Sequence, residues 1–358
     1  MDYNSYRRKT NGFKVGNVGI GADYLVSIQS MTNTSPYDHE ATYKQIRELE
    51  VSGCDIIRLA IPDIEAAAVI REMKTRGVKT PLVADIHFDY RIALAAIEAG
   101  VDKIRINPGN IGSREKTEAV VRACKEREIP IRIGVNSGSV EKSILEKYGS
   151  PTAEALSESA LFHAAILEDM NFDKIAISVK ASTVSEMIEA NRILAKRTSY
   201  PLHLGVTEAG FGVRAAIKSG VGIGALLAEG IGDTIRVSLT ENPVREVALA
   251  KDILSSLGIS ERGGMDIVSC PTCGRTKIDL IRLASEFEQK AKAAGIDRKN
   301  IKVALMGCAV NGPGEAREAD IGIAGGVGEG LLFKKGQIIR KISEESLVDE
   351  LIREIKLL

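Results

Sequence analysis

The sequence predicts an α/β protein that consists of a (β/α)8 TIM barrel over residues 1–258 and a small α+β domain over residues 259–358. Three observations lead to this prediction. Eight short, apolar, β-rich segments alternate with amphipathic helices. Polar and cationic residues stand at the ends of these segments, where barrel active sites lie. A Gly-rich break at residues 258–264 separates the two parts. A doubly wound open sheet is the competing fold, and it is disfavoured because neither end of the strand series shows an edge-strand pattern.

The rhythm of the first part begins at Tyr24 and runs strand, loop, helix, then glycine or proline. The predicted strands are Leu25–Gln29, Asp55–Ala60, Leu82–Ile86, Lys103–Asn107, Ile131–Val135, Lys174–Val179, Leu202–Val206 and Thr234–Leu239. The predicted helices are Asp38–Glu50, Ile64–Arg76, Tyr90–Ala99, Arg114–Arg127, Thr152–Met170, Val184–Arg197, Gly212–Ala228 and Pro243–Leu257. Gly77 and Gly100 directly follow predicted helices, as C-cap glycines do.

The second part has fewer elements. They are the strands Asp266–Ser269, Lys302–Met306 and Ile321–Ala324, a hairpin of Leu331–Phe333 and Gln337–Ile339, and the helices Lys277–Ala294 and Ser343–Lys356. The glycines at 326, 328 and 330 are similar to those of a phosphate loop. They lead into a strand and not into a helix N-terminus, so a hairpin turn is predicted there.

The composition argues against several classes of protein. Lys+Arg and Asp+Glu are equal at 48 each, so no global field favours nucleic acid or an anionic membrane. Trp is absent, which argues against a base-stacking platform. No apolar run approaches the ~20 residues that a membrane span needs. Five cysteines do not suggest a disulfide framework, so a cytoplasmic location is expected, with Cys54 and Cys124 in the core.

Four predicted strands carry an arginine between apolar residues: Arg58, Arg105, Arg132 and Arg236. Neighbouring residues alternate faces along a strand, so these arginines point into the barrel if the apolar residues pack under the helices. Burying them would be costly unless an anion is bound at the barrel mouth. Lys180 adds a fifth cation. The sequence therefore predicts a small, highly anionic ligand, for which phosphate groups are the natural choice.

Further polar residues gather at the same strand ends: Asp85, His87, Asn107, Asn136, Thr207, Glu208 and Ser238. Clustering at the C-terminal face of a barrel is typical of an active site. Glu208 is the candidate for proton transfer, because it is a lone carboxylate at a cationic mouth. Its alternative role is that of a salt-bridge partner for Arg236 or Lys180. For His87, a structural role and a role in binding the substrate both stay open.

The second part carries three cysteines at a notable spacing. Cys270 and Cys273 share one turn, and Cys308 opens a Gly/Pro-rich loop that also holds Asn311 and Glu315. Three thiolates placed in this way can share a metal or a cluster. Zinc would call for a fourth Cys or His, but the C-terminal third contains no histidine, whereas an iron–sulfur cluster tolerates a carboxylate ligand. The spacing therefore favours an iron–sulfur cluster over zinc, and three free core cysteines are the remaining alternative.

These segments, SCPTCGRT and MGCAVNGPGEA, resemble the C-terminal domain of the GcpE (IspG) family of bacterial 4-hydroxy-3-methylbut-2-en-1-yl diphosphate synthases. The resemblance extends over the barrel, where the motifs that match the family are IQSMT, ADIH, RINPG, RIGVN, SVK, GVTE and RVS. It implies a barrel followed by a sulfite-reductase-like iron–sulfur domain. It also implies that the barrel residues bind or act on a cyclic diphosphate: Arg58, Asp85, His87, Arg105, Arg132, Asn136, Lys180, Thr207, Glu208, Arg236 and Ser238.

The resemblance further implies one [4Fe-4S] cluster per chain, with Cys270, Cys273, Cys308 and Glu315 as ligands and Asn311 near the substrate. The reaction expected of the family is a two-electron reductive ring opening and dehydration of 2-C-methyl-D-erythritol 2,4-cyclodiphosphate. Flavodoxin or ferredoxin would donate the electrons. Glu208 and Glu315 would be the catalytic residues. The family arrangement is a head-to-tail homodimer, and neither nucleic acid nor a membrane is expected as a partner.

Two rival functions follow from the residues alone. One is a pterin-type barrel transferase with an appended metal domain, which predicts no redox-active cluster. The other is a zinc-stabilised binding module, which predicts one zinc per chain and loss of folding with a chelator. Iron and acid-labile sulfide content separates these functions.

Overall fold

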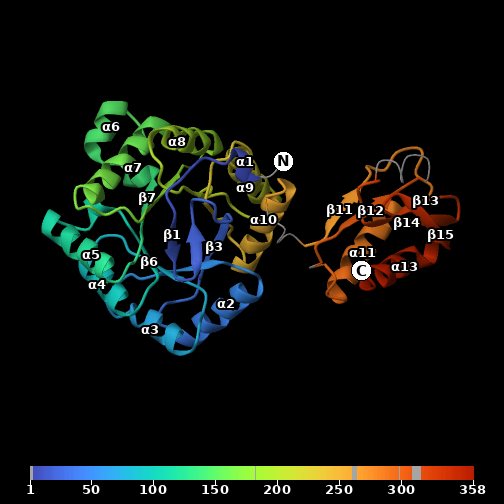
Figure 1. The fold of residues 1–358 in the computed structure, drawn as a ribbon, viewed down its shortest axis with the longest axis horizontal. Helices are drawn as coiled ribbons and strands as arrows, with labels where there is room; N and C mark the ends of the chain where they lie inside the picture. The colour runs from blue at the N-terminus through green and yellow to red at the C-terminus, as the bar shows by residue number, and fades with distance from the viewer. Residues whose placement is uncertain (1–2, 182, 260–263, 298, 309–315) are drawn as a thin grey trace. The chain divides into compact units, whose positions relative to one another are not determined.

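The computed structural model describes residues 3–181, 183–259, 264–297, 299–308 and 316–358. The chain divides into two compact units, residues 1–260 and residues 261–358 (Figure 1).

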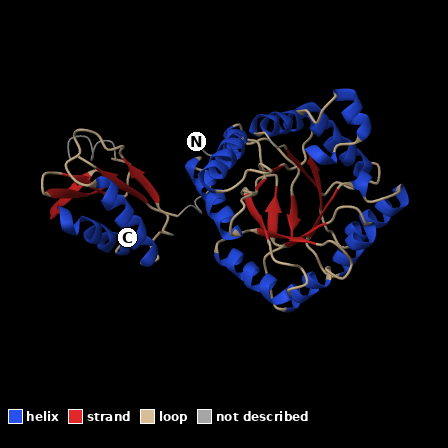
Figure 2. Cartoon of the chain, turned by 180° about the vertical axis from the view of Figure 1, so that it is seen from behind, coloured by secondary structure: helices blue, strands red, loops and turns tan. Residues whose placement is uncertain are grey.

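The first unit is a closed parallel barrel of eight strands, which confirms the predicted fold class. The strands are β3 (Ser27–Met31), β4 (Ile56–Ala60), β5 (Leu82–Asp85), β6 (Lys103–Ile106), β7 (Ile131–Asn136), β8 (Ile175–Lys180), β9 (His203–Leu204) and β10 (Thr234–Ile235). They pair in the order β8-β7-β6-β5-β4-β3-β10-β9, and a bridge between Ile177 of β8 and Leu202 closes the ring. Figure 2 shows the strands encircled by helices.

The helices of this unit cover the outward faces of the strands. They are α2 (His39–Val51), α3 (Ala68–Thr75), α4 (Tyr90–Glu98), α5 (Arg114–Glu126), α7 (Ala153–Glu168), α8 (Val184–Arg197), α9 (Gly212–Ala228) and α10 (Pro243–Ser256). Outward residues such as Ile57, Ile104 and Ile133 are fully buried beneath them. This packing forms the main apolar core of the unit.

Some predicted bounds are wrong. Strands β9 and β10 are much shorter than predicted, although the Arg236 N–H still donates to the Leu204 carbonyl at 2.9 Å. Helix α3 begins at Ala68 and not at Ile64. The Asp63 carboxylate accepts the Ala66 N–H at 2.8 Å, and short-range turns occupy residues 64–67, so the α-helical pattern starts one turn later.

The sequence did not predict the helices α1 (Tyr3–Tyr6) and α6 (Lys142–Tyr148). It also did not predict the hairpin of β1 (Phe13–Val15) and β2 (Val18–Ile20). The hairpin matters most. Its apolar side chains form one cluster with Ile56, Val83 and Ala176, which lie at or next to the beginning of barrel strands and point inward. The hairpin therefore plugs the N-terminal end of the barrel, and the C-terminal end is left for a ligand.

In its described residues, the second unit is a five-stranded sheet with helices α11 (Leu280–Ala293) and α13 (Leu347–Lys356) on one face. The strands are β11 (Asp266–Ser269), β12 (Lys302–Met306), β13 (Ile321–Gly325), β14 (Glu329–Lys334) and β15 (Gln337–Ser343). Strands β11, β12 and β13 run parallel, and β14 and β15 continue the sheet antiparallel. The antiparallel pairing of β13 with β14 confirms the hairpin turn that was predicted at the glycines of residues 326–330. Among the described residues, no helix is long and apolar enough to cross a membrane.

Candidate functional site

The strand alternation places the predicted arginines inside the barrel. Arg105 on β6 and Arg132 on β7 are direct register partners, and Arg58 lies on β4. Their apolar neighbours Ile57 and Ile106 are fully buried on the other face of their strands. Arg132 is only 1% exposed. The guanidinium groups therefore occupy the barrel interior, where a (β/α)8 barrel usually holds branched apolar side chains.

A cavity of about 240 Å³ opens among these side chains. It is lined by Arg58, Asp85, His87, Arg105, Arg132, Gly134, Asn136, Ser178, Lys180, Thr207, Arg236 and Ser238. Ten of these twelve are the substrate-binding residues predicted in the barrel. Gly134 and Ser178 are additions, although both lie inside quoted motifs. The structure thus brings the predicted barrel residues together, and their role in binding stays a prediction.

The charge of the cavity is strongly positive. Of the described residues that line it, five are cations and only Asp85 is a carboxylate. Its oxygens lie 3.9 Å from Arg58 Nε, 3.5 Å from Arg105 Nη1 and 3.6 Å from His87 Nε2. Burial favours a higher pKa for this carboxyl. Arg58, His87 and Arg105 outweigh burial and hold the pKa well below its usual range. Asp85 is therefore an ionised anchor for its cationic neighbours.

A second carboxylate stands behind Arg236. Glu246 of α10 is 4% exposed, and its Oε2 lies 3.6 Å from Arg236 Nε. The same carboxylate accepts hydrogen bonds from Ser30 Oγ at 2.8 Å and from the Leu239 N–H at 3.0 Å. Glu246 thus orients Arg236 from outside the cavity.

The cavity holds more positive than negative charge, and this imbalance affects the pKa values of its cations. Burial, and then the neighbouring arginines, lower the pKa of Lys180 and of Arg132 well below the usual values. Burial lowers the pKa of Arg58 to about 10. Within the described part of the chain, Arg132 Nε and Nη2 and Ser178 Oγ are buried without a hydrogen-bond partner. Buried donors normally have partners, and an anion in the cavity would supply them to these atoms.

Two glycines make room for the cations. A Cβ at Gly134 would lie 2.4 Å from Arg105 Nε, and Arg105 Nη2 donates to the Gly134 carbonyl at 2.7 Å. A Cβ at Gly205 would lie 2.6 Å from the Arg236 carbonyl and 3.2 Å from Lys180 Nζ. Arg105 and Lys180 therefore lie flat over backbone that carries no side chain.

Glu208, the predicted proton-transfer residue, is exposed and is not among the cavity-lining residues. It adopts a left-handed backbone conformation with φ of 54°, which is strained for a residue other than glycine. Strain of this kind persists where the surroundings require it, often at functional sites. The catalytic role of Glu208 stays a prediction.

A buried histidine that the sequence reasoning missed connects two loops at the strand ends. His163 of α7 is fully buried, and its Nδ1 accepts the Gly109 N–H at 3.1 Å. Its Nε2 lies 2.6 Å from Glu141 Oε1. Gly109 follows β6 and Glu141 follows β7, so His163 ties together the loops behind Arg105 and Arg132. Only the fold brings these segments together, because they are distant in the sequence.

Two of the three cysteines of the second unit lie at the same edge of its sheet, where the parallel strands end. Cys270 and Cys308 follow the C-terminal ends of the neighbouring parallel strands β11 and β12. The Gly307 N–H donates to Cys270 Sγ at 3.2 Å. Hydrogen bonds from the Arg275 backbone and side chain lower the pKa of the Cys273 thiol. The lowered pKa favours the Cys273 thiolate, and thiolates are the donors that an iron–sulfur cluster takes. The chemistry of these donors therefore fits such a group.

The ligand set itself is incomplete in what the structure describes. Across the described residues, no three His, Cys, Asp or Glu side chains are grouped closely enough to hold a metal ion. The predicted residues Asn311 and Glu315 lie outside the described residues. Cys54 and Cys124, predicted as core residues, are both buried.

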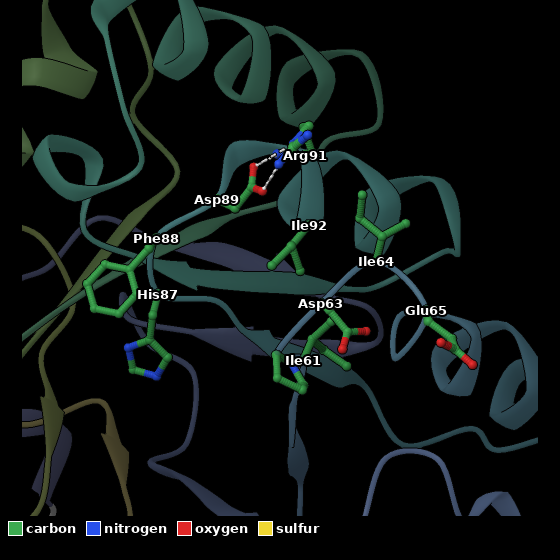
Figure 3. Close-up of a pocket in the computed structure, with 10 residues that line it drawn as sticks. Ile61, Asp63, Ile64, Glu65, His87, Phe88, Asp89, Arg91 and Ile92 are labelled. Carbon is green, nitrogen blue, oxygen red and sulfur yellow. Dashed lines mark hydrogen bonds and ion pairs between the residues drawn. The ribbon is translucent and has the colours of Figure 1, made fainter.

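A second, larger cavity of about 690 Å³ shares only His87 with the first (Figure 3). It is lined by Ile61, Pro62, Asp63, Ile64, Glu65, His87, Phe88, Asp89, Arg91 and Ile92. Three carboxylates and one arginine give it the opposite charge balance, and Phe88 is 77% exposed. It is therefore unsuited to bind a diphosphate.

The fold and the site together define a class of protein. It has a (β/α)8 barrel with a cationic cavity at the C-terminal ends of its strands, followed by a separate cysteine-bearing sheet unit. The GcpE TIM-barrel domain model matches residues 10–251, and the GcpE protein C-terminal domain model matches residues 266–357. The chain belongs to the GcpE family. This finding confirms the family predicted from the sequence.

Curated relatives agree over nearly the whole chain. A protein of Clostridium perfringens is 61% identical over 98% of this chain and 99% of its own length. One of Bacillus cereus is 55% identical over 99% of this chain and 95% of its own length. Both are named 4-hydroxy-3-methylbut-2-en-1-yl diphosphate synthase (flavodoxin). Among solved structures, the type I 3-dehydroquinate dehydratase of Clostridium difficile covers 70% of this chain and 98% of its own, with a TM-score of 0.51 at 14% identity. This likeness shows the barrel fold alone.

Proposed function

We propose that the chain is an oxidoreductase that converts 2-C-methyl-D-erythritol 2,4-cyclodiphosphate to 4-hydroxy-3-methylbut-2-enyl diphosphate, in the non-mevalonate isoprenoid pathway. The observation that carries this proposal is the barrel cavity, in which five cations face a single carboxylate. Such a cavity suits a compact ligand with two phosphate groups. The names of the full-length relatives supply the product, and they speak against a pterin-type transferase or a zinc-stabilised binding module.

We further propose that Cys270, Cys273, Cys308 and Glu315 hold one [4Fe-4S] cluster per chain. The hydrogen bond that Cys270 Sγ accepts and the lowered pKa of Cys273 support these two cysteines as ligands. When bound, the cluster supplies the two electrons of the reduction. Flavodoxin, which stands in the relatives' names, is the proposed donor, with ferredoxin as the alternative.

The residues of the barrel would bind and orient the substrate and would protonate its departing hydroxyl. Arg58, Arg105 and Arg132 would neutralise the phosphate oxygens of the substrate, and Asp85 keeps the first two oriented. His87 and the small polar residues of the cavity would fix the ring. Loss of a hydroxyl as water requires one proton, and we assign the proton transfer to Glu208. Asn311 is proposed to contact the substrate.

The test begins with iron, sulfide and visible absorbance of anaerobically purified protein. About four iron and four sulfide per chain are expected, and Cys308→Ser should lose them. Turnover of the cyclic diphosphate is then measured with reduced flavodoxin and with reduced ferredoxin. Zinc in place of iron, or a full cluster without turnover with either donor, would refute the proposal.

Assembly and location are part of the same proposal. We propose a cytoplasmic enzyme that works as a head-to-tail homodimer, as the family resemblance implies. Sedimentation of the anaerobic protein tests the dimer, and a monomer that retains full turnover would contradict it.

A further inference from the structure

One layer of polar side chains inside the barrel has no part in the site described so far. Gln29 of β3, Lys103 of β6 and His203 of β9 are each 1% exposed and do not line the cavity. Lys103 stands two residues before Arg105, and His203 stands two residues before Gly205, on the same inward faces. This polar layer therefore lies one side-chain level below the cavity.

The polar layer is sealed from below. Val83, the register partner of Lys103, belongs to the apolar cluster of the β1–β2 plug. Within the described residues, both polar atoms of the Gln29 side chain and both ring nitrogens of His203 are buried without a hydrogen-bond partner. Such atoms are normally met by ordered water. Because the plug covers the lower side, we take the cavity as the route by which water enters.

The charged groups that act most strongly on Lys103 and His203 are cations. Arg132 from β7 and Arg58 from β4 act most strongly on Lys103. Arg132, Lys180, Lys103 and Arg58 act most strongly on His203. Val83 and the plug residues in its cluster contribute apolar surface. Asp85, the carboxylate that lines the cavity, already faces Arg58 and Arg105.

This environment disfavours further positive charge. Burial, followed by Arg132 and Arg58, lowers the pKa of Lys103 to about 7. Burial, followed by the same cations, lowers the pKa of His203 well below its usual value. Without a ligand, Lys103 is therefore mostly neutral at pH 8. An anion in the cavity reverses the sign of the local field and favours the ammonium form.

We propose that Lys103 belongs to the anion-binding machinery: when a dianion enters the cavity above it, Lys103 takes up a proton from solvent and becomes a sixth cation for the ligand. The proton arrives through the cavity and the waters of the polar layer. The choice of ligand rests on the proposed function, but the coupling does not. Affinity for the anion and the protonation of Lys103 are then linked, as any two binding events on one protein can be.

The coupling is measured as proton uptake in calorimetric titrations of the full chain with the cyclic diphosphate, without reductant, so that no turnover occurs. Each phosphorus of this ligand carries one strongly acidic oxygen, so its own charge is constant between pH 6 and pH 8. The slope of binding heat against the ionisation enthalpy of the buffer counts the protons, with Tris and Hepes compared at pH 8 and Mes and Bis-Tris compared at pH 6. A pKa that rises from about 7 by two units or more gives roughly 0.8 proton at pH 8 and roughly 0.1 at pH 6 from Lys103.

Three variants separate Lys103 from other sources of protons. Lys103→Met should remove the 0.8 proton at pH 8, and any uptake by Lys180 would remain. Lys103→Arg should also remove it, because arginine is already charged, but it should retain anion binding at pH 8. Lys44→Met, which alters an exposed lysine on α2, should leave the uptake unchanged. Thermal melts confirm that each variant is folded.

The outcomes distinguish this inference from the proposed function. Absence of binding would overturn the proposed function. Binding with heats that do not depend on the buffer, or full uptake in folded Lys103→Met, would overturn the role of Lys103 alone. If neither Lys103 variant folds, the wild-type profile decides: equal uptake at pH 6 and pH 8 would refute the inference.

Discussion

Gly134→Ala tests the anion site with the smallest possible change. The added Cβ would lie 2.4 Å from Arg105 Nε and 3.0 Å from its Nη2. The contacted atoms are the end of a flexible side chain, so the backbone can keep its course while the guanidinium moves. Arg105 would then lose its 2.7 Å hydrogen bond to the Gly134 carbonyl and its 3.5 Å approach to Asp85.

The expected loss follows from the charged hydrogen bond that Arg105 is proposed to donate to a phosphate oxygen. A hydrogen bond from a charged donor contributes about 1.5–3 kcal/mol. At ~1.4 kcal/mol per tenfold change, displacement of Arg105 should weaken binding of the cyclic diphosphate about 10- to 100-fold. The fold should survive, because the new methyl group meets a side chain that can move. In steady-state turnover the same loss should appear mainly as a higher KM, since Arg105 binds the diphosphate in the ground state and the transition state alike.

Calorimetric titration with the cyclic diphosphate measures the loss, and a thermal melt checks the fold. Gly138→Ala is the matched control, because it changes a nearby glycine whose Cβ would meet nothing within 4 Å. Binding by Gly134→Ala within twofold of the wild type, with an unchanged melt, would refute the placement of Arg105 in the anion site. A collapsed melt in Gly134→Ala but not in Gly138→Ala would mean that the backbone, and not Arg105, gives way.

Three other variants extend the test. Asp85→Asn should lower stability at pH 7 by about 3–5 kcal/mol, because it leaves buried arginines without their carboxylate. The pKa of Asp85 is lower in the folded state than its unfolded value near 4, so its stabilising effect is present above that pH. In urea melts, the difference in stability between wild type and variant should therefore narrow as the pH falls through 4 and below. His163→Phe removes the acceptor for the Gly109 N–H and should cost about 1–3 kcal/mol in the same assay, whereas His163→Gln, whose carbonyl can accept that bond, should recover part of it; equal losses in both would argue against the bridge. Glu208→Gln should lower kcat at least ~100-fold with unchanged binding of the cyclic diphosphate, and a normal kcat would exclude it as the proton-transfer residue.

The sequence predicts the barrel and its cavity well because both follow from the alternation of side chains between the two faces of a strand. Each of Arg58, Arg105 and Arg132 stands between apolar residues on one strand, so a local pattern is enough to assign its face. The chain order of strands and helices then fixes the common end at which these side chains meet. Ten residues of the cavity could therefore be named without any spatial information.

Features that depend on contacts between distant segments could not be predicted in this way. The β1–β2 plug consists of two three-residue strands, too short to give a periodic signal. His163 lies on α7 among residues typical of a buried helix, and nothing near it in the sequence indicates Gly109 or Glu141. Gly134 stands within a quoted motif, but its reason, the guanidinium of Arg105 across it, comes from the neighbouring strand.

The polar layer shows why the inner face of a barrel misleads a reader of the sequence. Lys103-Ile-Arg-Ile106 has the alternation of a strand with one apolar face and one solvated face. Closure of the ring and the plug beneath it turn that apparently solvated face into an interior, where Lys103 is 1% exposed. Charged groups in such an interior are stable only with a compensating anion or with loss of a proton. The cavity cations and the polar layer are therefore one electrostatic unit, and the state of Lys103 depends on whether the cavity above it holds an anion.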